Sequence, residues 1–437
     1  MTAISLSQQA TWRERAEAMV STASWTRPWS MIDRERSAWL ADWLVVALAV
    51  SLPWSTTATG ILAVLWLIAV IPTLDRTAMR RVLLTPAGGI PVLFWGLALA
   101  GTLWAFDVSL AERWAGVKPF HRLLAIPLLI AQFQRSENAQ RVLIGFVISC
   151  GALLVLSWIV VVDPTLPRLW AGREVTIGIP VKDYIAQSGE FTFCIFVLAA
   201  LALAAWHEGR RRHAIAPLLL ALAFLVNVVY VATSRTSLVI LPIMLLLFAC
   251  RHLSWKGVTA LLSTGVVTGA LVLVFVPAVH RNVASLVQEL RTYQPHGRST
   301  RAGERLEFWR KSIGFIADAP LVGHGTGSIR DQFRRSAVGE TGMAALASSN
   351  PHNQTFAVAI QLGLLGTMVL FAIWIAHLSM FRGYGLPAWA GLVVVTQNIV
   401  SSLFNSHLFD FTQGWSYVVG VGVTAGVVFR DRASGSA

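Results

Sequence analysis

The chain has 437 residues, of which 55% are apolar and only 13% are charged, and its mean hydropathy is +0.62. These values exclude an ordinary soluble domain, which must cover its surface with polar side chains. A net charge of +13 would suggest nucleic acid as a partner of a soluble protein. In a membrane protein, however, many basic residues serve to set the orientation in the bilayer, so they must first be assigned to one side of the membrane or the other. We therefore expect membrane lipid, and no nucleic acid, as a partner of this chain.

The chain begins with a polar segment and continues with repeated apolar runs. Residues 1–37 are mixed in charge and lack the apolar core of a signal peptide, so we expect a cytoplasmic lead. Each later run is long enough to cross about 30 Å of hydrocarbon as a helix. The pattern predicts an all-α membrane protein with about 12 transmembrane helices. The spans are expected near 38–54, 58–74, 89–106, 119–134, 141–162, 190–206, 214–232, 236–250, 257–278, 354–380, 386–404 and 413–429.

The charged connections indicate an orientation. Short connections rich in arginine alternate with connections that are nearly uncharged or long, which by the positive-inside rule places both termini in the cytoplasm. The chain then divides into the lead, spans one to nine (38–278), an outer loop (279–353), spans ten to twelve (354–429) and a cytoplasmic tail (430–437). The three cysteines lie inside apolar runs and are expected to pack there, with neither a disulfide nor a zinc site.

The outer loop 279–353 is basic, although the positive-inside rule does not account for basic residues on that side. A basic surface next to apolar walls attracts an anionic amphiphile such as a lipid-linked phosphate or pyrophosphate. A solvated loop that faces anionic headgroups is the alternative. The basic residues are Arg281, Arg291, Arg298, Arg301, Arg305, Arg310, Lys311, Arg330, Arg334 and Arg335.

Segment 301–319 of this loop predicts an amphipathic helix that ends before Pro320. Its expected apolar stripe contains Leu306, Trp309, Ile313 and Ile316. Arg301 and Arg305 stand four residues apart, so their cations share one face, which is unfavourable unless an anion or a carboxylate joins them. The following glycine-rich segment, 323–327, either presents backbone N–H groups to phosphate or forms a plain turn, and the turn is favoured because no strand precedes it.

Two arginines lie near the ends of apolar runs. Arg235 is the only charged residue between two apolar runs, 214–232 and 236–250, which are joined by a very short connection. An ionised residue at such a depth normally faces the bundle interior or a water-filled cavity, although an arginine can also extend its side chain to the interface. Arg122, beside His121 at the outer end of the fourth expected span, is a weaker candidate for the same position.

His352 is the sharpest candidate for chemistry. It lies between Pro351, which restricts Asn350 to extended geometry, and the span that begins near Gln354. That position places the imidazole at the mouth of a membrane cavity, with Asn350, Asn353 and Gln354 available to orient it. Histidine titrates near neutral pH, which suits a general base that removes a proton from a sugar hydroxyl. A surface histidine without a catalytic role is the alternative.

These residues together resemble the O-antigen ligase family of bacterial membrane glycosyltransferases. The resemblance depends on the sequence Pro-His-Asn at 351–353 followed by Gly-Leu-Leu-Gly at 363–366. Ahead of it stand Arg301, Arg305, Trp309 and the Pro-Leu-Val-Gly-His-Gly segment at 320–325, with Ser234 and Arg235 further upstream. Together with the spans and the outer loop, the resemblance covers essentially the whole chain.

The resemblance implies transfer of O-antigen polysaccharide from undecaprenyl pyrophosphate to a sugar hydroxyl of lipid A-core, on the periplasmic face of the bacterial inner membrane. It implies no metal, cofactor or nucleotide sugar, and the long outer loops contain no Asp-X-Asp metal motif. By this resemblance His352 is the base or positions the acceptor. Arg235, Arg301 and Arg305 hold the pyrophosphate, and Arg122 is a further candidate. Direct displacement would invert the anomeric configuration.

Other functions remain open. Asp410, in the short outer turn before the last span, could orient His352 or an arginine, or could be a simple turn carboxylate. An O-antigen polymerase or a protein O-oligosaccharyltransferase would use the same donor with another acceptor. A lipid or glycan transporter belongs to a different class, but the chain shows no internal repeat of the kind expected there. The sequence does not give the donor sugars, the acceptor hydroxyl or the oligomeric state.

Overall fold

The computed structural model describes residues 33–165 and 177–435, and within these ranges the chain is helical and has no strand. The expected all-α class is therefore confirmed. Most of the expected lead and the last two residues of the tail lie outside the described residues. The α-helices are α2 (Arg34–Ser51), α3 (Thr56–Val70), α4 (Arg76–Leu83), α5 (Pro86–Ala100), α6 (Leu110–His121), α7 (Ala125–Phe133), α8 (Ala139–Val162), α9 (Tyr184–His207), α10 (Arg211–Tyr230), α11 (Arg235–His252), α12 (Trp255–Phe275), α13 (Pro277–Arg291), α14 (Arg301–Asp318), α15 (Ile329–Arg335), α16 (Gln354–Met380), α17 (Leu386–Ser401) and α18 (Phe411–Ala433).

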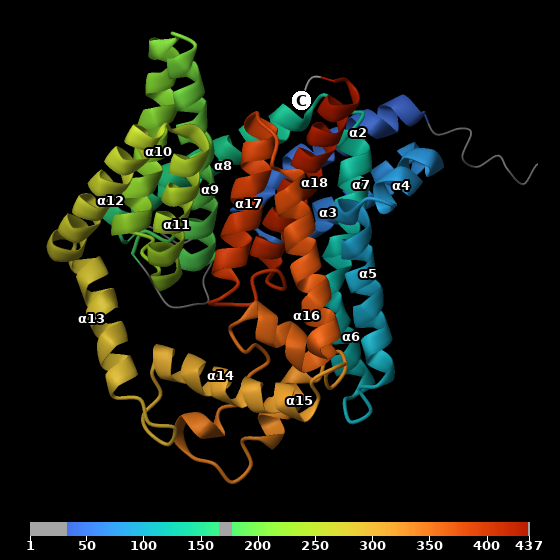
Figure 1. Cartoon of the computed structure of the whole chain (residues 1–437), viewed down its shortest axis with the longest axis vertical. Helices are drawn as coiled ribbons and strands as arrows, with labels where there is room; N and C mark the ends of the chain where they lie inside the picture. The colour runs from blue at the N-terminus through green and yellow to red at the C-terminus, as the bar shows by residue number, and fades with distance from the viewer. Residues whose placement is uncertain (1–32, 166–176, 436–437) are drawn as a thin grey trace, which may run out of the picture.

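Most helices stand side by side in one bundle, with α9 to α12 on one side, α5 to α7 on the other and α16 to α18 between them (Figure 1). Every expected span falls on a helix of this bundle or on a group of short helices. Within the described residues, eight helices are long and apolar enough to cross a membrane. The other four expected spans, which fall on α2, on the short helices of 119–134, on α17 and on α18, do not meet this criterion, so the count of about 12 stays a prediction.

The fourth expected span, 119–134, is not one continuous helix. It divides into α6, a 3-10 turn η3 (Arg122–Leu124) and α7. Pro119 lies inside α6 and Pro127 lies in the first turn of α7. Because proline has no N–H to donate, each interrupts the ladder of helical hydrogen bonds near the turn. The break places Arg122 at a bend rather than along a helix face.

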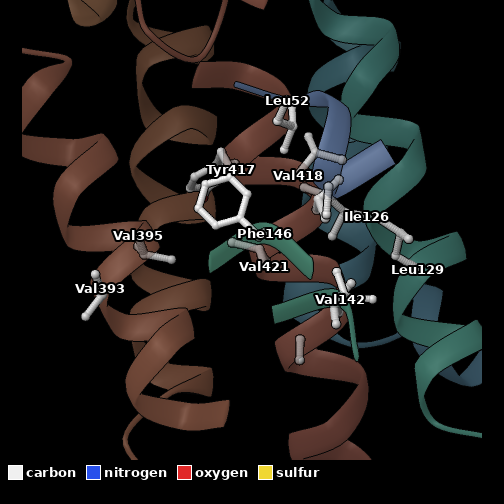
Figure 2. Close-up of a cluster of buried hydrophobic side chains, with 14 of the residues drawn as sticks. Leu52, Ile126, Leu129, Val142, Phe146, Val393, Val395, Tyr417, Val418 and Val421 are labelled. Atoms are coloured by element: carbon white, nitrogen blue, oxygen red, sulfur yellow. The ribbon is translucent and has the colours of Figure 1, made fainter. Parts of the chain in front are cut away.

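The core of the bundle is apolar and closely packed. Figure 2 shows part of it, where Val418 of α18 lies beside Ile126 of α7. A Cβ atom added to Gly422 would come within 2.5 Å of the Cβ atom of Leu129. Small residues therefore allow these two helices to approach closely, as is common in membrane bundles where packing drives association.

Residues 277–353 form a cap across the end of the bundle opposite the C-terminus (Figure 1). The cap contains α13, α14, α15 and the 3-10 turn η4 (Gly342–Ala345). The helix expected at 301–319 is confirmed by α14. Its predicted apolar stripe is only partly buried, because Ile316 packs against the apolar cluster of the cap whereas Ile313 is 59% exposed. The buried face also carries Phe308 and Phe315, together with a fully buried Glu307 that accepts from Tyr293 and Arg310. Which side of the membrane the cap occupies stays a prediction.

The glycine-rich segment after α14 joins the cap to a break in α16. Gly363, inside α16, has a φ of 60° and interrupts the helix. The carbonyl groups of Ile360 and Gln361 then accept from the N–H groups of His324 and Gly325, each at 2.9 Å. The N–H of Gly327 donates to the side chain of Gln361 at 2.8 Å. These backbone N–H groups bond within the protein, as expected of a turn rather than of a phosphate loop.

Candidate active site

His352 lies in the link between the cap and α16, in an unusual backbone conformation. Its φ is 54°, and Lys182 is the only other non-glycine residue with a positive φ in the described ranges. Such backbones cost of order 1–3 kcal/mol and concentrate at functional sites. The His352 N–H donates to Oδ1 of Asn350 at 2.8 Å, and Asn353 caps the first turn of α16 by accepting from the N–H of Phe356. The link is therefore fixed on both sides of the imidazole.

A chain of hydrogen bonds connects His352 to the turn between α17 and α18. Nδ1 of His352 lies 3.0 Å from Oδ1 of Asn405, which also accepts from Asn350 at 2.8 Å. The amide nitrogen of Asn405 donates to Oδ2 of Asp410 at 2.8 Å. Nε2 of His352 has no hydrogen-bond partner among the described residues. We call these four residues, His352, Asn350, Asn405 and Asp410, the histidine cluster.

The surroundings of His352 keep its imidazole neutral. The ring of Phe308 on α14 stacks against it, with centroids 6.0 Å apart and planes 20° apart. Burial lowers the pKa of His352, the positive charge of Arg305 lowers it further, and the contact with Asn405 opposes this shift. A neutral imidazole with an unused nitrogen is the form that a general base requires.

Arg305 lies near His352, and its guanidinium is largely buried. Its charge acts on His352 and on His407, as well as on Arg235 and Arg301. It forms no hydrogen bond and no ion pair with any residue in the described part of the chain. A buried guanidinium normally has a partner, so Arg305 is the residue best prepared to receive an anion from outside the protein.

Arg235, at the start of α11, already has an anionic partner. Its guanidinium holds Glu289 of α13 with contacts of 2.5 and 3.3 Å, and it also donates to Ser285 at 3.1 Å. Glu289 accepts in addition from the N–H of Ala302 at 2.7 Å, in the first turn of α14. The hydrogen bond from Arg235 lowers the pKa of Glu289, and the charge of Arg301 adds to this. We call Arg235, Glu289, Arg301 and Arg305 the arginine cluster.

The remaining predicted residues have structural contacts. Arg122 donates to the backbone carbonyls of Phe409, Asp410 and Phe411, so it holds the turn that carries Asp410. Its role in pyrophosphate binding stays a prediction. Asn353 donates to the carbonyl of Leu403 at 3.2 Å and does not bond to His352. Burial raises the pKa of Asp410 to about 6, against the opposing charge of Arg122.

Three residues of the site were not singled out by sequence reasoning. Asn405 and His407 surround Asp410 in a polar turn between two apolar runs, and that composition was the available signal. His407 is 3% exposed, and neither of its ring nitrogens has a hydrogen-bond partner. It lines a cavity of about 450 Å³ between α9, α17 and α18. Glu289 is the only acidic residue of α13, and nothing in the sequence pairs it with Arg235.

No group of three or more His, Cys, Asp or Glu side chains is arranged to hold a metal ion within residues 33–165 and 177–435. The polar groups that converge are instead guanidinium groups, the imidazoles of His352 and His407, and the amides beside His352. Guanidinium groups form bidentate contacts with phosphate oxygens, and an imidazole accepts a proton near neutral pH. The site thus combines an anion-binding half with a proton-accepting half.

A comparison with protein families identifies the region that carries both halves. Residues 220–371 match a family model described as O-antigen ligase. The chain contains an O-antigen ligase domain. The match covers about a third of the chain and includes the whole arginine cluster, together with Asn350 and His352. It confirms the family resemblance that the sequence indicates, while a search of curated proteins found no match.

The O-antigen ligase domain extends from α10 into α16, so it includes the cap and the helices that flank it. Together with the apolar helices of the chain, the match points to a multi-pass membrane protein. Asn405 and Asp410 lie outside the matched residues, although they bond to His352 or to each other. The active-site candidate is therefore completed by the turn between α17 and α18.

Proposed function

We propose that this protein is an O-antigen ligase, which transfers O-antigen polysaccharide from undecaprenyl pyrophosphate to a sugar hydroxyl of lipid A-core. The observation that carries the proposal is the pairing of two unused groups in the O-antigen ligase domain. One is Nε2 of His352, and the other is the guanidinium of Arg305. An anionic leaving group and an acceptor hydroxyl are the two reactants that these groups suit.

On the donor side, Arg305 binds the diphosphate, with Arg235 and Arg301 beside it. As the bond between the anomeric carbon and the diphosphate oxygen breaks, the electron pair leaves with the diphosphate and its negative charge grows. Guanidinium groups neutralise that charge and place two parallel N–H donors on phosphate oxygens. They take the part that a metal ion plays in other diphosphate reactions, so we propose a metal-independent step.

On the acceptor side, Nε2 of His352 accepts the proton from the sugar hydroxyl while its oxygen attacks the anomeric carbon. The new glycosidic bond forms on the face opposite the departing diphosphate, so the configuration inverts. Because the lowered pKa keeps His352 neutral near pH 7, the base is ready before the acceptor arrives. We place this reaction on the periplasmic face of the bacterial inner membrane, with both termini in the cytoplasm.

The test is transfer by the purified protein in liposomes, with a defined lipid-pyrophosphate glycan as the donor and lipid A-core as the acceptor. We expect a glycosylated lipid A-core and a released lipid pyrophosphate. Elongation of the lipid-linked glycan instead would identify a polymerase, and modification of an added acceptor protein would identify a protein O-oligosaccharyltransferase. Movement of the donor across the membrane without transfer would identify a transporter.

A further inference from the structure

Asn405 joins the imidazole of His352 to the carboxylate of Asp410. Its Oδ1 atom lies 3.0 Å from Nδ1 of His352, and its Nδ2 atom lies 2.8 Å from Oδ2 of Asp410. The three residues come from the start of α16 and from the turn between α17 and α18. The carboxylate therefore reaches the imidazole only through a neutral amide.

The hydrogen-bond pattern fixes which nitrogen of His352 carries the proton. The backbone N–H of His352 is an unambiguous donor, so the Asn350 atom that it contacts at 2.8 Å is the acceptor Oδ1. The other amide atom of Asn350 is then Nδ2, which donates to Asn405 at 2.8 Å. The contacted atom of Asn405 is consequently Oδ1, and it can only accept. Nδ1 of His352, which faces the same oxygen, must be the protonated nitrogen.

The hydrogen bond between Asn405 and Asp410 agrees with this assignment. With Oδ1 of Asn405 directed at His352, its Nδ2 is directed at Asp410, and an ionised carboxylate is an acceptor. Ser406 adds a second donor to Oδ1 of Asn350 at 2.8 Å, which secures the same orientation. The proton on Nδ1 leaves the lone pair on Nε2, which is the nitrogen without a partner among the described residues.

The amide also keeps the negative charge of a carboxylate out of direct contact with His352. A carboxylate in direct contact with an imidazole stabilises the imidazolium form and raises its pKa by about 1–3 units. A neutral amide orients the ring without that effect. The charged groups that face His352 are Arg305 and Glu304 of α14, with His407 and Asp410 beyond Asn405.

We propose that Asn405 is a positioning residue that holds His352 in the Nδ1–H form, with Nε2 available to the acceptor hydroxyl, and that Asp410 fixes the orientation of the Asn405 amide. This inference rests on the proposed function of His352 as the proton acceptor. Asn405 touches neither substrate in this scheme and acts through the histidine.

The test compares Asn405→Ala and Asn405→Asp in the purified full-length protein, with pH–rate profiles for transfer. We expect Asn405→Ala to lower kcat by about tenfold to hundredfold, as loss of an orienting partner does, and to leave the donor KM unchanged. Asn405→Asp is made together with Asp410→Asn, so that two carboxylates do not face each other across the present 2.8 Å contact. We expect this protein to retain the contact with His352 and to move the acidic limb of the profile up by about one pH unit. Asn138→Ala is the matched control, because Asn138 donates to Asp42 at 2.8 Å near the opposite end of the bundle.

Wild-type kcat in Asn405→Ala, or an acidic limb that does not move in the protein that carries both Asn405→Asp and Asp410→Asn, would overturn the positioning role. The same loss of kcat in the Asn138→Ala control would also overturn it, because a general effect of losing a half-buried, hydrogen-bonded amide would then explain the result. Full activity of a His352→Ala variant would instead remove the proposed function itself. An inactive His352→Ala protein beside a fully active Asn405→Ala protein would remove only this inference.

Discussion

The histidine cluster and the arginine cluster lie in one site but differ in how their polar groups are satisfied. In the histidine cluster each residue is hydrogen-bonded to the next, and Nε2 of His352 has no partner among the described residues. In the arginine cluster Arg235 is already bound to Glu289, whereas Arg305 has no ion pair among the described residues. In the proposed mechanism the acceptor half is therefore organised before substrate binds, whereas Arg235 in the donor half must first release Glu289.

The largest effect is expected from the histidine cluster. His352→Ala should lower the transfer rate by about 10²–10⁴-fold, because general-base catalysis contributes that much. The measurement is transfer in liposomes at equal amounts of inserted protein. His280→Ala is the matched control, since His280 is exposed on the cap and contacts neither cluster. A His352→Ala protein that retains substantial activity would remove His352 as the base.

The next effect concerns the arginine without a partner. Arg305→Lys keeps the charge but loses the bidentate contact with phosphate, so we expect kcat/KM for the donor to fall by about tenfold or more, which corresponds to about 1.4 kcal/mol. Arg310→Lys on the same helix is the control, because Arg310 is exposed and pairs with Glu307. Equal rates in the Arg305→Lys and wild-type proteins would indicate a structural role for Arg305.

A smaller effect, of opposite sign, is expected from the internal carboxylate. Glu289→Gln removes the charge that competes with the donor for Arg235 but keeps an oxygen that can accept from Ala302. We expect the donor KM to fall about threefold, a difference of about 0.6 kcal/mol. Titration with increasing donor concentration measures it. A higher KM would show that Glu289 holds Arg235 in place for the donor.

The smallest effect is a shift in pH dependence. The base must be unprotonated, so the rate should fall as the pH drops through the pKa of His352. Burial and Arg305 lower that pKa, so the midpoint of the acidic limb should lie below the ordinary histidine value of about 6.5. A pH–rate profile of kcat/KM measures it. A midpoint above 6.5 would contradict the proposed surroundings of His352.

The sequence predicted the residues whose local signals are strong. His352 stands at the boundary between a polar loop and an apolar run, and Arg305 follows Arg301 by one helical turn, so both could be selected without a structure. Helix positions were also predictable, because each apolar run is long enough to span the membrane and is bounded by polar residues. The division of the fourth span was less evident, because a proline at 119 or 127 does not by itself say where a helix breaks.

Partners across the fold could not be predicted. Asn405 lies 53 positions from His352, and Glu289 lies 54 positions from Arg235, so no local pattern joins either pair. The buried face of α14 was predicted only in part, for a related reason. Glu307 is buried because Tyr293 and Arg310 satisfy its carboxylate, and hydropathy alone assigns a glutamate to the surface.

The division of labour between the clusters is tested most directly by the binding of the lipid-pyrophosphate donor to purified His352→Ala and Arg305→Ala proteins. We predict that His352→Ala binds the donor within about threefold of the wild-type Kd, a difference below about 0.7 kcal/mol, while it forms no product. Arg305→Ala should bind the donor at least about tenfold more weakly, because its phosphate contact is lost. Equal weakening of donor binding in both variants would contradict separate donor and acceptor halves.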